Sequence, residues 1–253
     1  MEKKQKTVAP YSKLSLIYDE VMAHVDYELW AKYAEKILNR HGARPQSYLD
    51  VSCGTGSFLL SLYKKGKIYF GCDYSLPMLL FAKKKSYDKA IHFFRADMSS
   101  FVVKQEMDVI FCLYDSINYL SNFGLWKKFF HSVYSALRPN GLFVFDVCTE
   151  LNSVIYFDNV VDQGRGSGYS YVRESFFDRN KRVHHNKFFI DLIDEPLIYV
   201  EDHQQTIFRV SEVVALIEDS PFTLLGVYDG FSFMPGSEES LRVHFVLRKP
   251  END

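Results

Sequence analysis

Short apolar segments alternate with amphipathic ones through the first 148 residues of the chain. The apolar segments are rich in aromatic and β-branched residues and fall at 48–51, 68–73, 92–97 and 108–115. Around them, apolar residues recur at helical spacing over 11–23, 27–40, 58–64, 76–87 and 125–137. This alternation of strands with helices predicts an α/β protein with a doubly wound, mostly parallel sheet.

The pattern changes after residue 148. Long aromatic and β-branched runs without helical spacing occupy residues 169–177, 182–194 and 196–208, and they predict a small antiparallel β insertion. A helix over 211–219 is expected next, with Ser211 as its N-cap. Residues 222–233 and 241–248 then predict an antiparallel pair that completes a seven-stranded sheet.

A glycine turn follows the first predicted strand. In the sequence YLDVSCGTGSF, Gly54 and Gly56 let the backbone pass close to a ligand. A dinucleotide fingerprint needs a third glycine at position 59, which is Leu59, so a nicotinamide enzyme is disfavoured. Acids also stand at the ends of the later strands, at Asp73, Asp97 and Asp115. The sequence therefore predicts a site for a small polar cofactor at the carboxyl edge of the sheet.

These segments resemble the class I S-adenosylmethionine-dependent methyltransferases. Five stretches are similar to that family's motifs, in its order: 49–56, 71–75, 95–98, 113–120 and 137–147. The segment YSKLSLIYD at 11–19 extends the resemblance toward the N-terminus. The resemblance implies a Rossmann-like methyltransferase fold and S-adenosyl-L-methionine as the cofactor.

The resemblance also assigns roles to the first two motifs. Backbone at Ser52, Gly54 and Gly56 is expected to line the amino acid part of the cofactor, and Asp50 to hold its ammonium group. Asp73 is expected to accept from both ribose hydroxyls, since a carboxylate offers two acceptor oxygens.

The later motifs imply the remaining cofactor contacts. Asp97 is expected to accept from the adenine amino group, while the Met98 N–H faces a ring nitrogen. Tyr74 and Met78 are expected to pack on the ring. Leu113 is expected to border the methyl group.

Tyrosines and one acid are the candidates for catalysis. Tyr11 and Tyr18 are expected to close over the cofactor, and Tyr114 to border the methyl group. Tyr11, Tyr114 and Asp115 are the candidate catalytic residues, with His184 as a further candidate base. Each of these residues has a structural alternative. Tyr11 and Tyr18 would instead be core residues, and Asp115 would instead cap a helix. The same capping role is an alternative for Asp73 and Asp97.

The expected organisation has four parts: N-terminal helices covering the cofactor site (1–44), a cofactor-binding core (45–148), the β insertion (149–207) and a return to the core sheet (208–253). The insertion builds either an acceptor pocket or a homodimer contact. Its adjacent His184 and His185 alternate across a strand, so they cannot both bind one metal, and no metal is expected. Lys83, Lys84 and Lys85 are interpreted as a solvated helix end.

Composition restricts the partners. The chain has 253 residues, 47% of them hydrophobic, and a net charge of −2, so there is no basic field for DNA, and RNA is disfavoured. The four cysteines form no C-x-x-C pair, which favours buried thiols over a zinc site or disulfides. The sequence contains no apolar run long enough for a membrane-spanning helix, so no membrane partner is expected. The protein is expected in the cytoplasm.

The leading hypothesis is a methyltransferase that acts on a small-molecule amine, hydroxyl or carboxyl group. One alternative is an RNA-modifying methyltransferase. Another is a non-catalytic S-adenosylmethionine-binding protein, in which Tyr114, Tyr119 or Phe231 would block the acceptor side. The sequence leaves open the acceptor, the atom methylated and the use of a general base.

Overall fold

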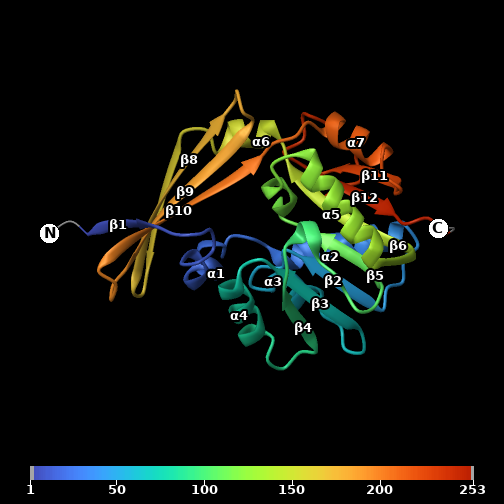
Figure 1. Ribbon diagram of the computed structural model, residues 1–253, viewed down its shortest axis with the longest axis horizontal. Coiled ribbons are helices and arrows are strands. Elements are labelled where there is room, and N and C mark those ends of the chain that lie inside the picture. Colours follow the sequence, from blue (N-terminus) through green and yellow to red (C-terminus); the bar gives the residue numbers. More distant parts are fainter. Residues whose placement is uncertain (1–2, 252–253) are drawn as a thin grey trace.

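The computed structural model describes residues 3–251, which form two β-sheets and the helices around them (Figure 1). The larger sheet has the order β11-β12-β6-β5-β2-β3-β4. Its strands are β2 (Ser47–Val51), β3 (Ile68–Asp73), β4 (Ile91–Arg95), β5 (Met107–Cys112), β6 (Leu137–Cys148), β11 (Thr223–Asp229) and β12 (Arg242–Arg248). The five strands from β6 to β4 are parallel, and β12 and β11 add an antiparallel pair. The predicted fold class is confirmed.

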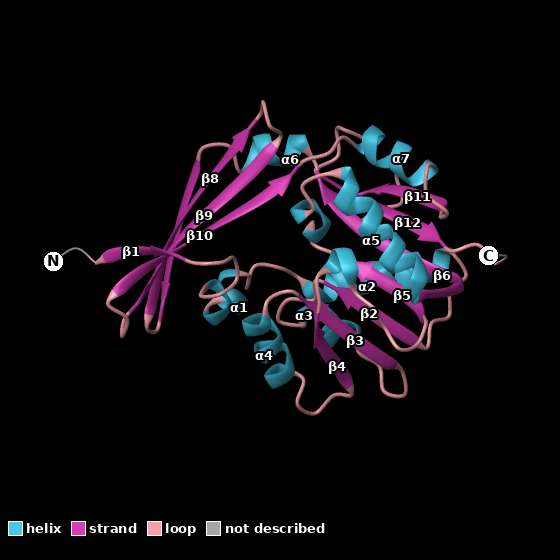
Figure 2. Ribbon diagram, in the orientation of Figure 1, coloured by secondary structure: helices cyan, strands magenta, loops and turns pink. Residues whose placement is uncertain are grey.

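The smaller sheet stands apart from the helices that flank the larger one (Figure 2). Its order is β1-β10-β9-β8-β7. The strands are β1 (Lys4–Thr7), β7 (Val160–Gly166), β8 (Tyr169–Asp178), β9 (Val183–Leu192) and β10 (Leu197–Thr206). The three longest of these are the predicted insertion strands. The N-terminal β1, which was not predicted, pairs in parallel with β10 and so ties the start of the chain to the insertion.

Strand alternation divides the core of the larger sheet into two layers. On β5, Ile110 and Cys112 face a cluster with α5 (Phe123–Ala136) and α7 (Val210–Glu218). Val109 and Phe111 face the opposite cluster with α2 (Tyr27–Arg40) and α3 (Ser57–Leu62). A strand that is apolar on both faces reads as a continuous apolar run, which is why these strands were recognisable in the sequence.

The order of the strands reverses between β2 and β5. The chain runs outward from β2 through β3 to β4, then returns to place β5 on the other side of β2. Open α/β sheets bind ligands in the crevice at this point, beyond the carboxyl ends of the strands. The glycine turn after β2 and the segment 113–115 after β5 therefore meet at the same edge.

The N-terminal segment differs from the predicted helix over 11–23. It contains a 3-10 turn, η1 (Leu14–Leu16), and a single helical turn, α1 (Tyr18–Val21). The fully buried carboxylate of Glu201 on β10 accepts from the backbone N–H groups of Tyr11, Lys13 and Leu14, at 2.6, 2.6 and 3.0 Å. Those bonds and the left-handed φ of +61° at Tyr11 replace regular helix.

Smaller differences concern helix ends. The α7 helix begins at Val210 with Arg209 as its N-cap, and the N–H of Arg209 donates to Glu212. The predicted cap, Ser211, instead donates to Glu238, so that assignment was wrong. The helices α4 (Leu76–Lys85) and α6 (Glu150–Tyr156) complete the fold, and α6 was not predicted. Within residues 3–251, no helix is long and apolar enough to cross a membrane.

Replacing Glu201 tests its hold on the N-terminal segment. Glu201→Gln keeps the shape of the side chain but removes the charge that strengthens the bonds from Lys13 and Leu14. We expect trypsin to cleave after Lys13 about tenfold faster in the folded variant, because local opening becomes easier. Glu174→Gln, at an exposed position on β8, is the matched control. Equal cleavage of both variants would contradict the assignment.

Candidate active site

Two cavities adjoin at the carboxyl edge of the larger sheet. Cavity A, of about 390 Å³, is lined by residues after β3 and β4, among them Asp73, Met78, Asp97 and Met98. Cavity B, of about 470 Å³, extends from the glycine turn to the inner face of the smaller sheet. Residues lining both are Tyr11, Tyr18, Ser52, Gly54, Ser116 and Tyr119. These shared residues mark a junction through which one extended ligand can occupy A and reach into B.

The turn after β2 uses left-handed backbone at three positions. Ser52, Gly54 and Gly56 have φ of +74°, +55° and +77°. A Cβ at Gly54 would meet nothing within 4 Å, so its missing side chain faces open space, whereas a Cβ at Gly56 would lie 3.2 Å from Ala82. Gly54 therefore keeps backbone exposed to the cavities, and Gly56 permits close packing behind the turn.

Asp73 fixes this turn from the neighbouring strand. Its Oδ2 accepts from the N–H of Gly54 at 2.9 Å, and its Oδ1 accepts from the N–H of Ser75 at 2.8 Å. Each carboxylate oxygen still has a second lone pair for a ligand hydroxyl. Asp73 thus serves as a turn acid and lines cavity A at the same time.

The charges at this end of the site favour a cationic ligand. Asp50 is buried on β2 and lines cavity B. Burial, and then the nearby charge of Asp73, raise the pKa of Asp50 well above its ordinary value. Burial also raises the pKa of Asp73, against the hydrogen bonds from Ser75 and Gly54. A positive group placed here would stabilise both carboxylates.

Cavity A has the lining of an aromatic-ring site. Its apolar walls include Met78, Met98, Leu120 and Leu125, and Asp97 lies among them. Asp97 also caps the 3-10 turn η2 (Met98–Ser100), accepting from the N–H of Ser99 at 2.8 Å. Capping and ligand binding are compatible here, because the second oxygen of Asp97 remains free to accept.

A buried ion cluster supports the segment after β5. Arg242 pairs with Asp115 at 2.6 Å and with the fully buried Asp146. Asp146 accepts from the N–H of Asp115 at 2.9 Å, and Tyr114 and Asp115 both have positive φ. Gln205 donates to Asp115 at 2.6 Å. Asp115 is therefore held in place by three partners, and although it stands at the N-cap position of the 3-10 turn η3 (Ser116–Tyr119), its side chain makes no capping bond.

The smaller sheet supplies the far wall of cavity B. Arg173 on β8 and His184, Asn186 and Phe188 on β9 line it. The Nε2 atom of His184 is buried and has no hydrogen-bond partner among the described residues. Burial lowers the pKa of His184 to about 4, so its imidazole is neutral at physiological pH. His185 lies on the other face and stacks on Phe176, as alternation predicted.

Most of the predicted site residues therefore converge. Those that line a cavity are Tyr11, Tyr18, Asp50, Ser52, Gly54, Asp73, Tyr74, Met78, Asp97, Met98, Leu113, Tyr114 and Asp115. Gly56 is not among the lining residues. Tyr114 and Tyr119 form walls and leave the cavity open, and Phe231 instead packs against Trp30. The blocked acceptor side expected of a non-catalytic protein is not observed.

Sequence reasoning missed several lining residues: Tyr119 as a site residue, His203, Gln205 and Arg242. Residues 201–206 of β10 read EDHQQT, polar at every position, so the sequence carried no signal that the face with Glu201, His203 and Gln205 is buried.

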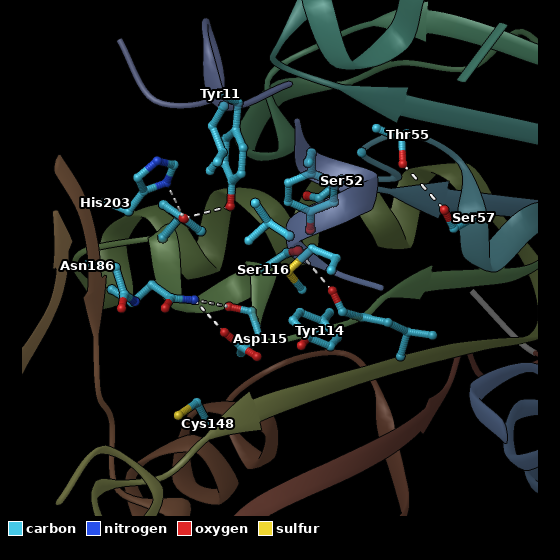
Figure 3. A pocket seen from close by; sticks show the side chains of 18 of the residues that line it. Tyr11, Ser52, Thr55, Ser57, Tyr114, Asp115, Ser116, Cys148, Asn186 and His203 are labelled. Carbon is cyan, nitrogen blue, oxygen red and sulfur yellow. Dashed lines mark hydrogen bonds between the residues drawn. The ribbon is translucent and has the colours of Figure 1, made fainter. Parts of the chain in front are cut away.

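The interpretation of Lys85 as solvated was wrong. Its ammonium group binds Asp19 at 2.8 Å, Ser57 Oγ at 2.7 Å and Thr55 Oγ1 at 3.0 Å, and so connects α4 to the N-terminal segment and the glycine turn. Figure 3 shows Thr55 and Ser57 on the side of the site away from Cys148 and Asn186. Lys83 and Lys84 are exposed, as predicted.

Comparisons with known proteins are consistent with this geometry. Residues 49–141 match a family described as a methyltransferase domain. A Bacillus subtilis protein with the provisional name methyltransferase YqeM is 30% identical over 243 residues, which are 94% of this chain and 97% of that protein. A dTDP-3-amino-3,6-dideoxy-alpha-D-glucopyranose N,N-dimethyltransferase of Streptomyces fradiae is 30% identical over 96 residues, 38% of this chain and 37% of that protein.

A solved structure shows the same fold over nearly the whole chain. An S-adenosylmethionine-dependent methyltransferase of Clostridium acetobutylicum superimposes with a TM-score of 0.81 at 23% identity. The match covers 95% of this chain and 99% of that one.

The ion cluster makes a prediction for stability. Arg242→Leu leaves Asp115 and Asp146 buried without their cation, so we expect the free energy of unfolding at pH 7 to fall by about 3–5 kcal/mol. Burial already raises the pKa of both acids and Arg242 opposes this, so both pKa values rise further in the variant. A carboxyl group whose pKa is higher in the folded protein than in the unfolded chain destabilises the fold at pH values above its folded-state pKa. It has no such effect at pH values below its unfolded-state pKa. The deficit should therefore shrink as pH falls toward 4, in urea unfolding at several pH values.

Arg248→Leu on the same strand is the matched control. The Arg248 guanidinium donates to the carbonyl of His41 and has no carboxylate partner among the described residues. Its deficit should be smaller and should not diminish toward pH 4. A deficit for Arg242→Leu that stays constant between pH 7 and pH 4 would show that the two acids are not held by this arginine.

Proposed function

Because the chain belongs to the class I S-adenosylmethionine-dependent methyltransferases, we propose that it methylates a small molecule bound in cavity B. The observation that carries the proposal is the cavity itself. It adjoins the cofactor edge, encloses about 470 Å³ and is closed on its far side by the smaller sheet. Small-molecule sites are concave pockets of this size with a few fixed polar groups.

The charges of cavity B also favour a small molecule over a nucleic acid. Its two lining arginines are already paired, Arg242 with Asp115 at 2.6 Å and Arg173 with Asp162 at 3.0 Å. A phosphodiester chain would need unpaired cations along its path. Asn186, His184 and Gln205 instead offer neutral hydrogen-bonding groups beside the ring of Phe188. This lining suits a polar metabolite of about the size of a sugar.

The residues present fit the cofactor. Asp50 would hold its ammonium group, Asp73 its ribose hydroxyls, and Asp97 with Met98 its adenine in cavity A. The raised pKa of Asp50 is consistent with this, since a positive ligand would stabilise the ionised form of the buried carboxyl. When bound, the cofactor supplies an electrophilic methyl group at a sulfonium.

The protein's own contribution is alignment. Left-handed backbone at Gly54 donates to Asp73, and left-handed backbone at Asp115 donates to Asp146 while its side chain pairs with Arg242. The glycine turn and the segment after β5 are thus in place before the ligands bind. Alignment of two reactants supplies roughly 7–11 kcal/mol of such a barrier. The N-terminal segment, clamped by Glu201, would exclude water from the same junction.

An amine is the acceptor class that the relatives favour. The Streptomyces fradiae relative is named for N-methylation of an amino sugar. The four cysteines are free and buried, which supports a working place in the reducing cytoplasm.

Binding of S-adenosylhomocysteine tests the cofactor assignment. We expect Asp50→Asn to weaken binding about tenfold or more, because the amide no longer neutralises the ligand's ammonium group. In the wild type, binding should weaken as pH falls through the raised pKa of Asp50, and the variant should lose this dependence. Titration calorimetry at several pH values measures both. Asp88→Asn, far from the cavities and exposed, is the control, and an affinity equal to the control would refute the role of Asp50.

A panel of acceptors tests the substrate class. The panel contains dTDP-3-amino-3,6-dideoxyglucose, other amino sugars, polyamines, amino acids, hydroxyl analogues of the sugars, carboxylic acids and a short RNA. We expect S-adenosylhomocysteine to form in amounts equal to a methylated small molecule, detected by mass spectrometry. Methylation of the RNA alone would refute the small-molecule proposal and leave the family assignment intact.

A further inference from the structure

Four polar side chains form one hydrogen-bonded chain from the smaller sheet to the junction of the cavities. The Oε2 atom of Glu201 lies 3.1 Å from Nε2 of His203, whose Nδ1 lies 2.9 Å from the hydroxyl of Tyr119. The hydroxyls of Tyr119 and Tyr11 are 2.7 Å apart. Figure 3 shows His203 and Tyr11 converging on the hydroxyl between them. Tyr11 and Tyr119 line both cavities, so the chain ends where the two ligands would meet.

Glu201 sets the direction of every bond in this chain. Burial disfavours its charge, but bonds from His203, Leu14 and Lys13 outweigh burial and lower the pKa of Glu201. An ionised carboxylate only accepts, so Nε2 of His203 carries a proton, and in the neutral imidazole Nδ1 is then an acceptor. Tyr119 donates to that nitrogen, and Tyr11 donates to Tyr119. The oxygen of Tyr11 therefore presents only lone pairs to the junction.

We propose that this chain is a proton relay, in which Tyr11 takes a proton from the acceptor and His203 receives one at Nδ1. The inference rests on the proposed function and narrows its substrate class. A relay that removes a proton is useful only when the nucleophilic atom carries hydrogen. The acceptor is therefore an amine or a hydroxyl compound and not a carboxylate.

The transfer balances without any further reactant. The acceptor nitrogen or oxygen exchanges one bond to hydrogen for one bond to the methyl carbon. Its proton goes to the oxygen of Tyr11, the former Tyr11 proton goes to Tyr119, and the former Tyr119 proton goes to Nδ1 of His203. The product is an imidazolium beside Glu201, with the His203–Tyr119 and Tyr119–Tyr11 hydrogen bonds reversed and the Nε2–H bond to Glu201 unchanged. Loss of one proton from His203 restores the starting direction.

The charged groups around the relay are mainly acidic. Glu201 is in direct contact with His203, and Asp115 and Asp73 act on the tyrosines from the other elements packed against them. Arg242, the cation nearest these acids, is bound to Asp115. Burial raises the pKa of both tyrosines, so they stay neutral and pass protons without forming a stable tyrosinate.

The direction of the chain is tested without any acceptor. Long-range proton–nitrogen NMR on wild-type protein with S-adenosylhomocysteine bound identifies which ring nitrogen of His203 is protonated, with His203→Gln to assign the signal. We expect the tautomer with hydrogen on Nε2 and a bare Nδ1. Hydrogen on Nδ1 would reverse the chain and overturn the proposal, whether or not any substrate is known.

The relay itself is tested by the pH dependence of Tyr119→Phe. We take the amine that the acceptor panel shows to be methylated fastest, beginning with dTDP-3-amino-3,6-dideoxyglucose. At neutral pH we expect kcat to fall about 100-fold, the loss typical of a missing proton acceptor. Above the pKa of the amine, the substrate arrives already deprotonated, and the variant should come within about threefold of the wild type. A structural defect would not be rescued by pH.

Matched variants separate the outcomes. Tyr48→Phe removes a hydroxyl from a buried tyrosine remote from the cavities, and it should leave the pH profile unchanged. If Tyr119→Phe does not fold, His203→Gln interrupts the same chain and should show the same rescue.

A loss of kcat that is equal at all pH values overturns the relay and leaves the proposed function standing. Failure of the wild type to methylate any small molecule overturns the proposed function, while the tautomer measurement still decides the chain's direction.

Discussion

One buried carboxylate, that of Glu201, ties the smaller sheet to the N-terminal segment, whose Tyr11 lines both cavities. It sits on the smaller sheet, yet its partners are backbone N–H groups of residues 11–14, far away in the sequence. A fully buried charge is stable only when it is well bonded, so these contacts must form together. The N-terminal segment is therefore held in place by β10 of the insertion. Because Tyr11 in this segment lines both cavities, β10 helps to complete the site although it lies outside the motif-like stretches.

The site has a consistent electrostatic character. Asp50 and Asp73 lie at the cofactor edge with raised pKa values, and burial also raises the pKa values of Asp115 and Asp146, against the charge of Arg242. Such an excess of acids costs folding free energy until a cation arrives. The cofactor carries positive charge, so its binding energy offsets a penalty that the fold already contains. In the proposed binding mode, selectivity for a cationic ligand follows from the same residues that would position it.

The sequence predicted the part of the molecule whose signals are local. The strands are short apolar runs, the turn at Gly54 needs glycine, and acids at strand ends converge because parallel strands share an edge. Contacts between distant segments had no such signal. The helix expected over 11–23 failed because Glu201 takes its N–H groups, and the tie between Lys85 and Asp19 is a tertiary contact that helical spacing cannot reveal.

In the proposed relay, the handling of the acceptor's proton depends on β10, a strand outside the five motif-like stretches. On β10, the pleat places Glu201, His203 and Gln205 on one face at every second position. Glu201 fixes the direction of the chain to Tyr11, and Gln205 fixes Asp115 beside it. A shift of one residue in register would turn all three outward. If the relay operates as proposed, the pairing of β10 with β9 and β1 is a requirement for chemistry as well as for folding, and a relative with the same cofactor motifs but another β10 would handle its acceptor proton differently.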